Sequence, residues 1–493
     1  MRKLKYLLIS IALISNVLLS YKLSIIIINK KPTISINVEN MKNKLTTKSN
    51  KSNHVKDDTK NSISTNTTDD NTIKDTTSPS DSNNSNTENV SFKTRDFFYN
   101  LDDTSINRSS SEHFQIIWGN EHDSVRINSD FTNGILDNLE TMREVYIDTL
   151  KMKDTSLSTK GDRHKYKTNI YFSNTGLKKI RNEKKYSACD NAGFAYMIVD
   201  PLLIRVDPPS WILAKEYAHA VILHQGGSLD SNWSDAMANW FRNQYLGSDK
   251  YSSNGTVYGP ASSFFKSVVL NSNLAFPQQK NAYDSWPFIT YISENPDKLD
   301  GLGLDLIHNI LEDKTIKNPI NAINKKTKLS LQDVIGNYSK RMITMDYTRQ
   351  KEYLTYLSEL QSTESNNDLI FTNLDFSSNT WVTVPYNKAP QQGGYNVIPI
   401  KDFSGKSTIT VEFHGIKNKN TDDWRGTIVA YNKNKTTTYS STWNDGKNTM
   451  KLSGNETALY LIVAATPKNF KDMSKIDTNK LTTYPYKVKV SFE

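Results

Sequence analysis

The stretch from Trp211 to Gly227, WILAKEYAHAVILHQGG, holds the residues whose types and spacing come closest to a metal site. Glu216 and His219 stand where the zinc-binding pattern H-E-x-x-H has its glutamate and second histidine, whereas Lys215 replaces the first histidine. In that pattern, two histidines four residues apart lie on one face of a helix and hold zinc. The glutamate acts as general base on a metal-bound water. The stretch therefore suggests a zinc enzyme together with one substitution that opposes it.

A third ligand would come from the segment that follows. Asp235 lies 16 residues past His219, within NWSDAMANWF, and offers a carboxylate from a second predicted helix. Lys215 is the difficulty, because an ammonium must lose its proton before it can bind zinc, and its reference pKa is about 10.4. The two protein ligands that remain fall short of the three expected in a catalytic zinc site. The site is therefore expected to be degenerate.

The pairing of KEYAH with WSDAMANWF resembles the gluzincin pattern of H-E-x-x-H followed by W-x-x-E-x-x-A. The wider layout includes SEHFQIIWG, NIYFSNTG, AGFAYM, WPFITYI and ALYLIVAATP, and it resembles a bacterial family of uncharacterised extracellular proteins, the domain of unknown function 6055. This resemblance covers most of residues 95–493. It implies a zinc-metallopeptidase-related domain with Glu216 at the position of the general base. It places His219 and Asp235 on the second and third ligand positions and Lys215 on the first.

Two functions follow from this comparison. The first is a non-catalytic binding protein without a cofactor, in which the charge of Lys215 replaces that of the metal and pairs with Glu216 or Asp235. The second, implied by the resemblance, is a secreted zinc metallopeptidase with an altered ligand set, Zn²⁺ as cofactor and Glu216 as general base. Further alternatives are an ordinary amphipathic helix with a solvent-facing Lys215, and a polysaccharide hydrolase that uses paired carboxylates.

Neither His224 nor Cys189 offers a stronger site. His224 lies five positions past His219, roughly 140° around a helix, so it points away unless the helix breaks near Gly226. Cys189 is the chain's only cysteine, which excludes an intrachain disulfide framework and a C-x-x-C zinc site. A lone cysteine is more commonly a small packed side chain than a nucleophile.

The positive charge of the chain is concentrated at its amino-terminal end. The formal net charge is +9, and residues 1–60 hold 12 Lys and Arg against 3 Asp and Glu. The remaining residues therefore hold 49 of each sign (61 − 12 and 52 − 3). A nucleic-acid reader normally carries its basic excess on the folded domain, so nucleic acid is not an expected partner. The expected partner is an extracellular protein or a cell-wall or host glycan.

The first residues are typical of an export signal. Arg2, Lys3 and Lys5 precede an apolar run, and residues 1–30 are expected to form a signal peptide or membrane anchor. The protein would then be extracellular or displayed at the cell surface, with the membrane as a partner if the segment stays uncleaved. Residues 31–92 are rich in Ser, Thr, Asn and Lys and predict a disordered linker that would act as a stalk.

Two folded domains are predicted after the linker. Strands followed by helices indicate an α+β domain, a mixed sheet then helices, over residues 93–362. The resemblance implies that this domain is gluzincin-like. After STESNND, closely spaced β-rich runs indicate an all-β sandwich over residues 366–493. Its three tryptophans could lie in the core or form a sugar-stacking face: Trp381, Trp424 and Trp443. In the first domain, strands are expected at 113–119, 166–173, 193–200 and 202–207, and helices at about 130–152, around 215, and at 232–247, 281–295, 302–314 and 330–360.

Overall fold

The computed structural model describes residues 92–122, 126–180, 184–251, 265–276, 284–471 and 481–493, which belong to one compact unit. The predicted signal or anchor segment, residues 1–30, and all but the last residue of the predicted linker, residues 31–92, lie outside them. Within these described ranges, no helix is both long and apolar enough to cross a membrane. The described residues combine helices with three sheets, so the content is mixed α/β.

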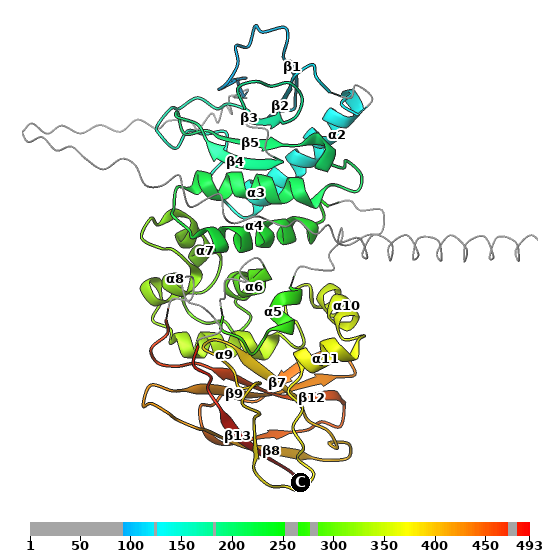
Figure 1. Ribbon diagram of the computed structural model, residues 1–493, viewed down its shortest axis with the longest axis vertical. Coiled ribbons are helices and arrows are strands. Elements are labelled where there is room, and N and C mark those ends of the chain that lie inside the picture. Colours follow the sequence, from blue (N-terminus) through cyan, green and yellow to red (C-terminus); the bar gives the residue numbers. More distant parts are fainter. Residues whose placement is uncertain (1–91, 123–125, 181–183, 252–264, 277–283, 472–480) are drawn as a thin grey trace, which may run out of the picture. The chain divides into compact units, whose positions relative to one another are not determined.

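A five-stranded mixed sheet with the order β1-β2-β3-β5-β4 forms the first layer (Figure 1). The central pairs β2–β3 and β3–β5 are parallel, and the two edge pairs are antiparallel. Strand β3 is buried along its whole length because side chains cover both faces of the sheet. Ile170 and Phe172 face the main core, and Tyr171 faces a smaller aromatic cluster. The strands are β1 (Asn107–Ser110), β2 (Phe114–Trp118), β3 (Thr168–Phe172), β4 (Lys185–Cys189) and β5 (Ala195–Val199).

Helices α2 (Ser129–Arg143) and α3 (Trp211–Gln225) pack on this sheet, and α4 (Ser231–Leu246) packs on α3 (Figure 1). The Asn128 side chain caps α2 by accepting a hydrogen bond from a backbone N–H of the first turn. The helix continues into the π-helical turn η2 (Glu144–Thr149). Helix α3 ends at Gly226, whose φ of 86° is the left-handed conformation that glycine adopts most easily.

Seven shorter helices complete the α-helical part of the described residues. The helix expected over 330–360 is divided into α9 and α10 by an irregular segment in which Met345 has a positive φ. The sequence patterns do not predict helices α5, α8 and α11, and α11 begins within the stretch that predicts a boundary between domains. The helices are α5 (Lys266–Leu270), α6 (Trp286–Glu294), α7 (Leu304–Glu312), α8 (Pro319–Lys326), α9 (Leu331–Arg341), α10 (Gln350–Leu360) and α11 (Glu364–Ile370).

One expected strand, residues 202–207, is wrong. Pro201 begins the short 3-10 helix η3 (Pro201–Leu203), and the side chain of Asp200 accepts a hydrogen bond from the Leu202 backbone N–H. This capping interaction competes with strand pairing, because it commits the backbone donor to a turn. Leu202 is 70% exposed and does not belong to the core.

The carboxy-terminal part is a sandwich of two antiparallel four-stranded sheets. Their orders are β10-β9-β12-β7 and β11-β8-β13-β6. Alternate residues of β8 and β13, such as Val411 and Val488, face a core shared by both sheets. The strands are β6 (Val382–Thr383), β7 (Tyr395–Pro399), β8 (Thr408–Gly415), β9 (Trp424–Asn432), β10 (Thr437–Tyr439), β11 (Gly446–Lys451), β12 (Glu456–Ala465) and β13 (Tyr486–Phe492).

The sheet that contains β9 and β12 is covered on both faces. On one face Leu461 belongs to the sandwich core, and on the other Ile462 belongs to the main core of the α-helical part. Helix α9 packs on β9 and β12, and a Cβ added at Gly336 would lie 2.6 Å from the Cβ of Arg425. Arg425 also donates from Nε to Asp333 Oδ1 at 2.6 Å. The residues predicted as two domains, 93–362 and 366–493, therefore share a core.

Candidate functional site

Helix α3 carries the candidate site and is buried nearly all around, because it lies between the five-stranded sheet and α4. A helix that is apolar on most of its faces is typical of such an enclosed position. Two of its charged residues are also buried: Lys215 is 2% exposed and Glu216 is 3% exposed. Burying a charge without a partner is costly, so the partners of these two groups decide what the site can do.

Lys215 pairs with Asp235 of the neighbouring helix α4. Lys215 Nζ donates to Asp235 Oδ1 at 2.7 Å, which is the length of a charge-assisted hydrogen bond. His219 Nε2 lies 3.4 Å from the same oxygen, and His219 Nδ1 lies 3.5 Å from the Ser234 hydroxyl. The structure therefore brings Lys215, His219 and Asp235 together, and the lysine side chain points into the helix pair and away from solvent.

The Asp235 carboxyl is held in its charged form. Burial raises the pKa of Asp235, but hydrogen bonds from His219 and Lys215, with the charges of both, lower it by more, so the pKa lies well below its usual range. The Asp235 side chain is nevertheless 45% exposed, while that of Lys215 is 2% exposed. One end of the pair is thus open to water and the other is enclosed.

Glu216 points toward the sheet and pairs with a different lysine. Lys185, at the start of β4, donates from Nζ to Glu216 Oε1 at 3.0 Å, and the Ser187 hydroxyl donates to the Glu216 carbonyl oxygen at 2.9 Å. The Glu216 side chain is 4% exposed, while that of Lys185 is 41% exposed. Each of the two carboxylates therefore has its own lysine. Sequence reasoning missed Lys185, because the short strand β4 was not predicted.

His224 and Cys189 stay apart from this cluster. His224 is buried and donates from Nε2 to the Leu157 carbonyl oxygen at 2.7 Å, and burial lowers its pKa. Cys189 ends the edge strand β4, and burial with the nearby charge of Asp190 raises the pKa of its thiol to about 11. A thiol with so high a pKa is a poor nucleophile at neutral pH.

The donor set does not fit a catalytic zinc ion. Two ligands of one tetrahedral zinc, each about 2.0–2.1 Å from the metal, lie roughly 3.3–3.4 Å apart. His219 Nε2 and Asp235 Oδ1, 3.4 Å apart, have that separation. The third position is taken by Lys215, whose Nζ donates to that oxygen at 2.7 Å. Across the described ranges, no group of three or more His, Cys, Asp or Glu side chains is placed to hold a metal ion.

Fold and site together define a protein with a mixed-sheet α/β part, a buried lysine paired with a partly exposed aspartate of the next helix, and a β-sandwich that shares its core. The family model described as a family of unknown function (DUF6055) matches residues 68–492. The chain belongs to this family. No curated protein gives a significant match to it.

Proposed function

We propose that this chain is an exported protein whose metallopeptidase-like domain no longer holds zinc and serves as a non-catalytic binding protein. The gluzincin relationship rests on KEYAH followed by WSDAMANWF, which provide Glu216, His219 and Asp235 at the expected spacing. The helices α3 and α4 that carry these residues lie against each other, as that relationship requires. Lys215 is the residue that separates this protein from an active enzyme.

The observation that carries the proposal is the pair of Lys215 with Asp235. The Lys215 side chain is 2% exposed, and its Nζ lies 2.7 Å from a carboxylate oxygen, so the buried amine has an anionic partner. A protonated amine has no lone pair to offer a metal ion. The positive charge of Lys215 instead offsets the negative charge of Asp235, which is the electrostatic role that a bound metal would have had.

The environment of Glu216 also favours a non-catalytic protein. A general base must reach the proton that it removes, either directly or through one water. The carboxylate of Glu216 is 4% exposed and is engaged by Lys185 at 3.0 Å. The competing function, a secreted zinc metallopeptidase with Glu216 as general base, is favoured only by the separation of His219 from Asp235.

Export and the class of partner belong to the same proposal. Arg2, Lys3 and Lys5 before an apolar run favour a signal peptide or anchor in residues 1–30, with the remainder outside the cell. A surface position favours an extracellular protein or a cell-wall or host glycan as the ligand. The neutral balance of charge after residue 60 argues against nucleic acid.

Comparison of the parent protein with its Glu216→Gln variant tests this function. Glutamine keeps the shape of the side chain and can still accept from Lys185, so the fold should be retained. We expect parent and variant to give the same background signal across a broad peptide library supplied with Zn²⁺. Cleavage by the parent that falls by about 100-fold or more in Glu216→Gln would instead establish the metallopeptidase, since that is the size of a general-base contribution.

A further inference from the structure

The outward face of the sheet β11-β8-β13-β6 carries a concentration of lysines. In each strand, alternate residues face away from the sandwich core, and the register places outward side chains of neighbouring strands opposite one another. Glu412 of β8 lies between Lys447 and Lys489, and His414 lies opposite Lys487. The lysines of this face are Lys447 and Lys451 on β11 and Lys487 and Lys489 on β13.

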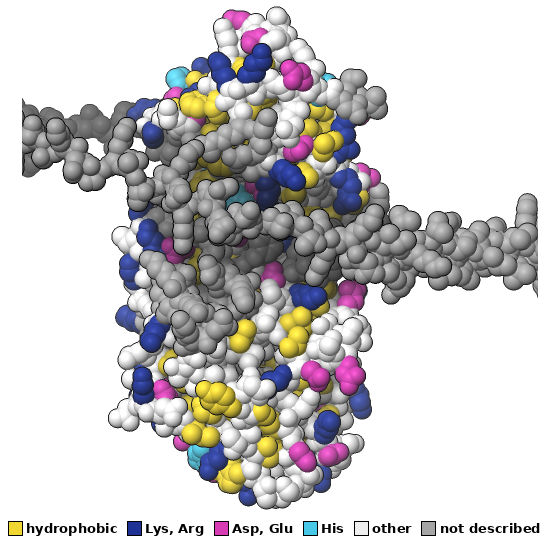
Figure 2. Space-filling model, viewed as in Figure 1, with side chains coloured by type: hydrophobic (Ala, Val, Ile, Leu, Met, Phe, Trp, Pro, Cys, Tyr) yellow, Lys and Arg dark blue, Asp and Glu magenta, His cyan; other side chains and the backbone are white. Residues whose placement is uncertain are grey.

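These four lysines form no ion pair with any other described residue. Two carboxylates of the face are directed at one imidazole: His414 Nε2 lies 3.3 Å from Glu412 Oε1, and His414 Nδ1 lies 3.1 Å from Asp445 Oδ1. A third carboxylate, Glu493, follows β13 on the same side and lies opposite Thr408. Four lysines against three carboxylates leave a formal charge of +1, although the chain after residue 60 is neutral as a whole. Figure 2 shows Lys and Arg side chains interspersed with Asp and Glu over the face in view.

A tryptophan lies at the edge of this lysine-rich face. Trp381 precedes β6 and is 37% exposed, whereas Trp424 is 1% exposed in the sandwich core. Lys487 Nζ lies 4.7 Å from the centroid of the Trp381 ring, and the His414 ring lies 5.0 Å from it. An exposed aromatic ring beside a lysine offers an apolar platform next to positive charge, the combination that an anionic sugar requires.

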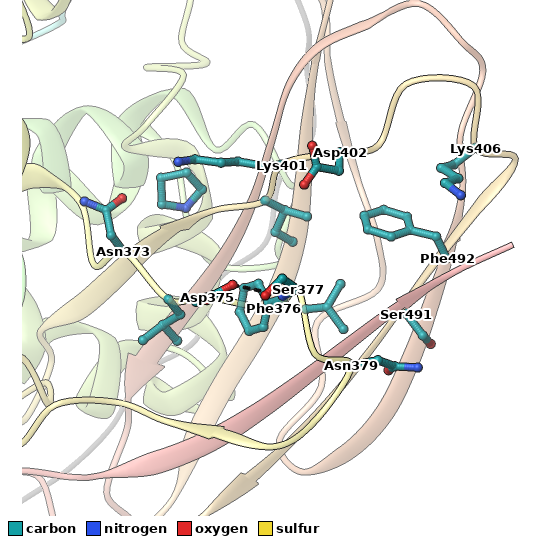
Figure 3. A pocket seen from close by; sticks show the side chains of 14 residues that line it. Asn373, Asp375, Phe376, Ser377, Asn379, Lys401, Asp402, Lys406, Ser491 and Phe492 are labelled. Atoms are coloured by element: carbon teal, nitrogen blue, oxygen red, sulfur yellow. Dashed lines mark hydrogen bonds between the residues drawn. The ribbon is translucent and has the colours of Figure 1, made fainter.

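A pocket of about 620 Å³ opens at the other end of β13. Ser491, which lies on the outward side of β13 with Lys487 and Lys489, is one of its lining residues. From Lys487 to Ser491 the strand rises by about 13 Å, so a short oligosaccharide could extend from Trp381 to the pocket. Figure 3 shows the rings of Phe376 and Phe492 among the side chains that line it. Its other labelled side chains are mainly amides, carboxylates and lysines, and its size lies within the range of ligand sites.

We propose that this face of the sandwich binds an anionic polysaccharide, with Trp381 stacking on a sugar ring and the four lysines pairing with its carboxylate or sulfate groups. The charge and the exposed ring select the ligand together: the lysines alone would accept any polyanion, and the ring alone any sugar. This binding site is separate from Lys215, so it goes beyond the proposed loss of zinc and does not depend on it.

The test measures binding of the full-length chain to immobilised polygalacturonate and heparin, with neutral dextran and inorganic polyphosphate for comparison. Residues 1–60 carry a net charge of +9, so a matched control is needed to separate their contribution. One variant replaces the four lysines of the face with glutamine, and the control replaces four exposed lysines without ion pairs to described residues. The control positions are Lys266, Lys314, Lys328 and Lys351.

Removal of the four outward-facing lysines should weaken glycan binding by about 10-fold to 100-fold, given the modest strength of each exposed ion pair. The variant with four control lysines replaced should change glycan binding by less than about 3-fold. Trp381→Ala should weaken binding to the anionic glycans by about 10-fold and leave polyphosphate binding unchanged, because polyphosphate has no ring to stack on. Thermal unfolding checks that each variant is folded.

Three results would overturn the proposal: equal losses in the two lysine variants, no loss in Trp381→Ala, or dextran binding as tight as polygalacturonate binding. Equal losses in the two lysine variants would assign polyanion binding to net charge alone. No loss in Trp381→Ala would mean that the ring does not contact the sugar. None of these results would bear on zinc or peptide cleavage, so a failure here is distinct from a failure of the function proposed for the α3–α4 site.

Discussion

The Asp235→Asn variant is expected to have a free energy of unfolding about 2 kcal/mol below that of the parent near neutral pH. The substitution removes the anionic partner at 2.7 Å from an ammonium that is 2% exposed. Breaking a fully buried ion pair by removing one partner costs about 3–5 kcal/mol. The lower figure of about 2 kcal/mol applies because the Asp235 side chain is 45% exposed and partly screened by water. Urea unfolding at matched protein concentration measures the difference.

The ion pair of Lys215 with Asp235 also makes the difference in unfolding free energy between the parent and Asp235→Asn depend on pH. The pKa of Asp235 in the folded protein lies below its usual value, so the folded state favours the ionised carboxyl. The stabilisation by Asp235 is therefore fully present above the unfolded pKa of about 3.9 and is lost as the pH falls toward the folded pKa. The difference in unfolding free energy between the parent and Asp235→Asn should therefore decrease progressively below about pH 4.

Two further variants control this prediction. Asp137→Asn removes an exposed carboxylate from α2 that has no ion pair with a described residue, and it should change the stability by no more than about 0.5 kcal/mol. Lys215→Met added to Asp235→Asn should restore stability, since the enclosed charge is then removed as well. A stability of Asp235→Asn equal to that of the parent would contradict a structural role for the pair.

The Lys215→His variant is expected to gain a zinc ion. An imidazole at position 215 would provide the missing ligand beside His219 Nε2 and Asp235 Oδ1, which already have the 3.4 Å separation of two ligands of one metal. Two histidines and one carboxylate form a protein ligand set of the kind found in zinc peptidases. Elemental analysis after removal of free metal should find close to one zinc per chain.

Lys185→His is the matched control, because it introduces the same side chain next to Glu216 but away from His219 and Asp235. It should bind no more zinc than the parent. Adding His219→Ala to Lys215→His should abolish the gain, since two ligands are too few for tight binding. Failure of Lys215→His to bind zinc would remove the main support for descent from a metal site, even if the lysine pair stabilises the fold as expected.

Local patterns were sufficient to predict the helices that carry the site. The spacing of KEYAH and WSDAMANWF indicated two helices, and the structure has α3 and α4 there, with Gly226 ending α3. The partner of Glu216 was not predictable in the same way. Lys185 belongs to a five-residue edge strand, and its ion pair joins residues 31 apart in sequence. No sequence pattern identifies the partner of an exposed lysine that begins a short strand.

The sandwich was indicated by its closely spaced β-rich runs, but its relation to the helices was not. In β12, Leu461 and Ile462 face different cores, and the sequence shows only a continuous apolar run that fits any strand covered on both faces. The polar stretch near residue 362 predicts a boundary between domains. Helix α11 occupies part of it, and α9 lies against β9 and β12. Such packing depends on contacts distant in sequence.

The zinc content of the unaltered protein tests most directly whether the Lys215 ammonium occupies the place of a metal ion. The full-length chain would be equilibrated with Zn²⁺, freed of unbound metal and analysed beside Asp235→Asn. The lysine–aspartate pair predicts no more zinc in the parent than in Asp235→Asn, because a protonated amine and two remaining ligands cannot hold the ion tightly. Close to one zinc per parent chain, lost in Asp235→Asn, would contradict this account and favour a working metal site.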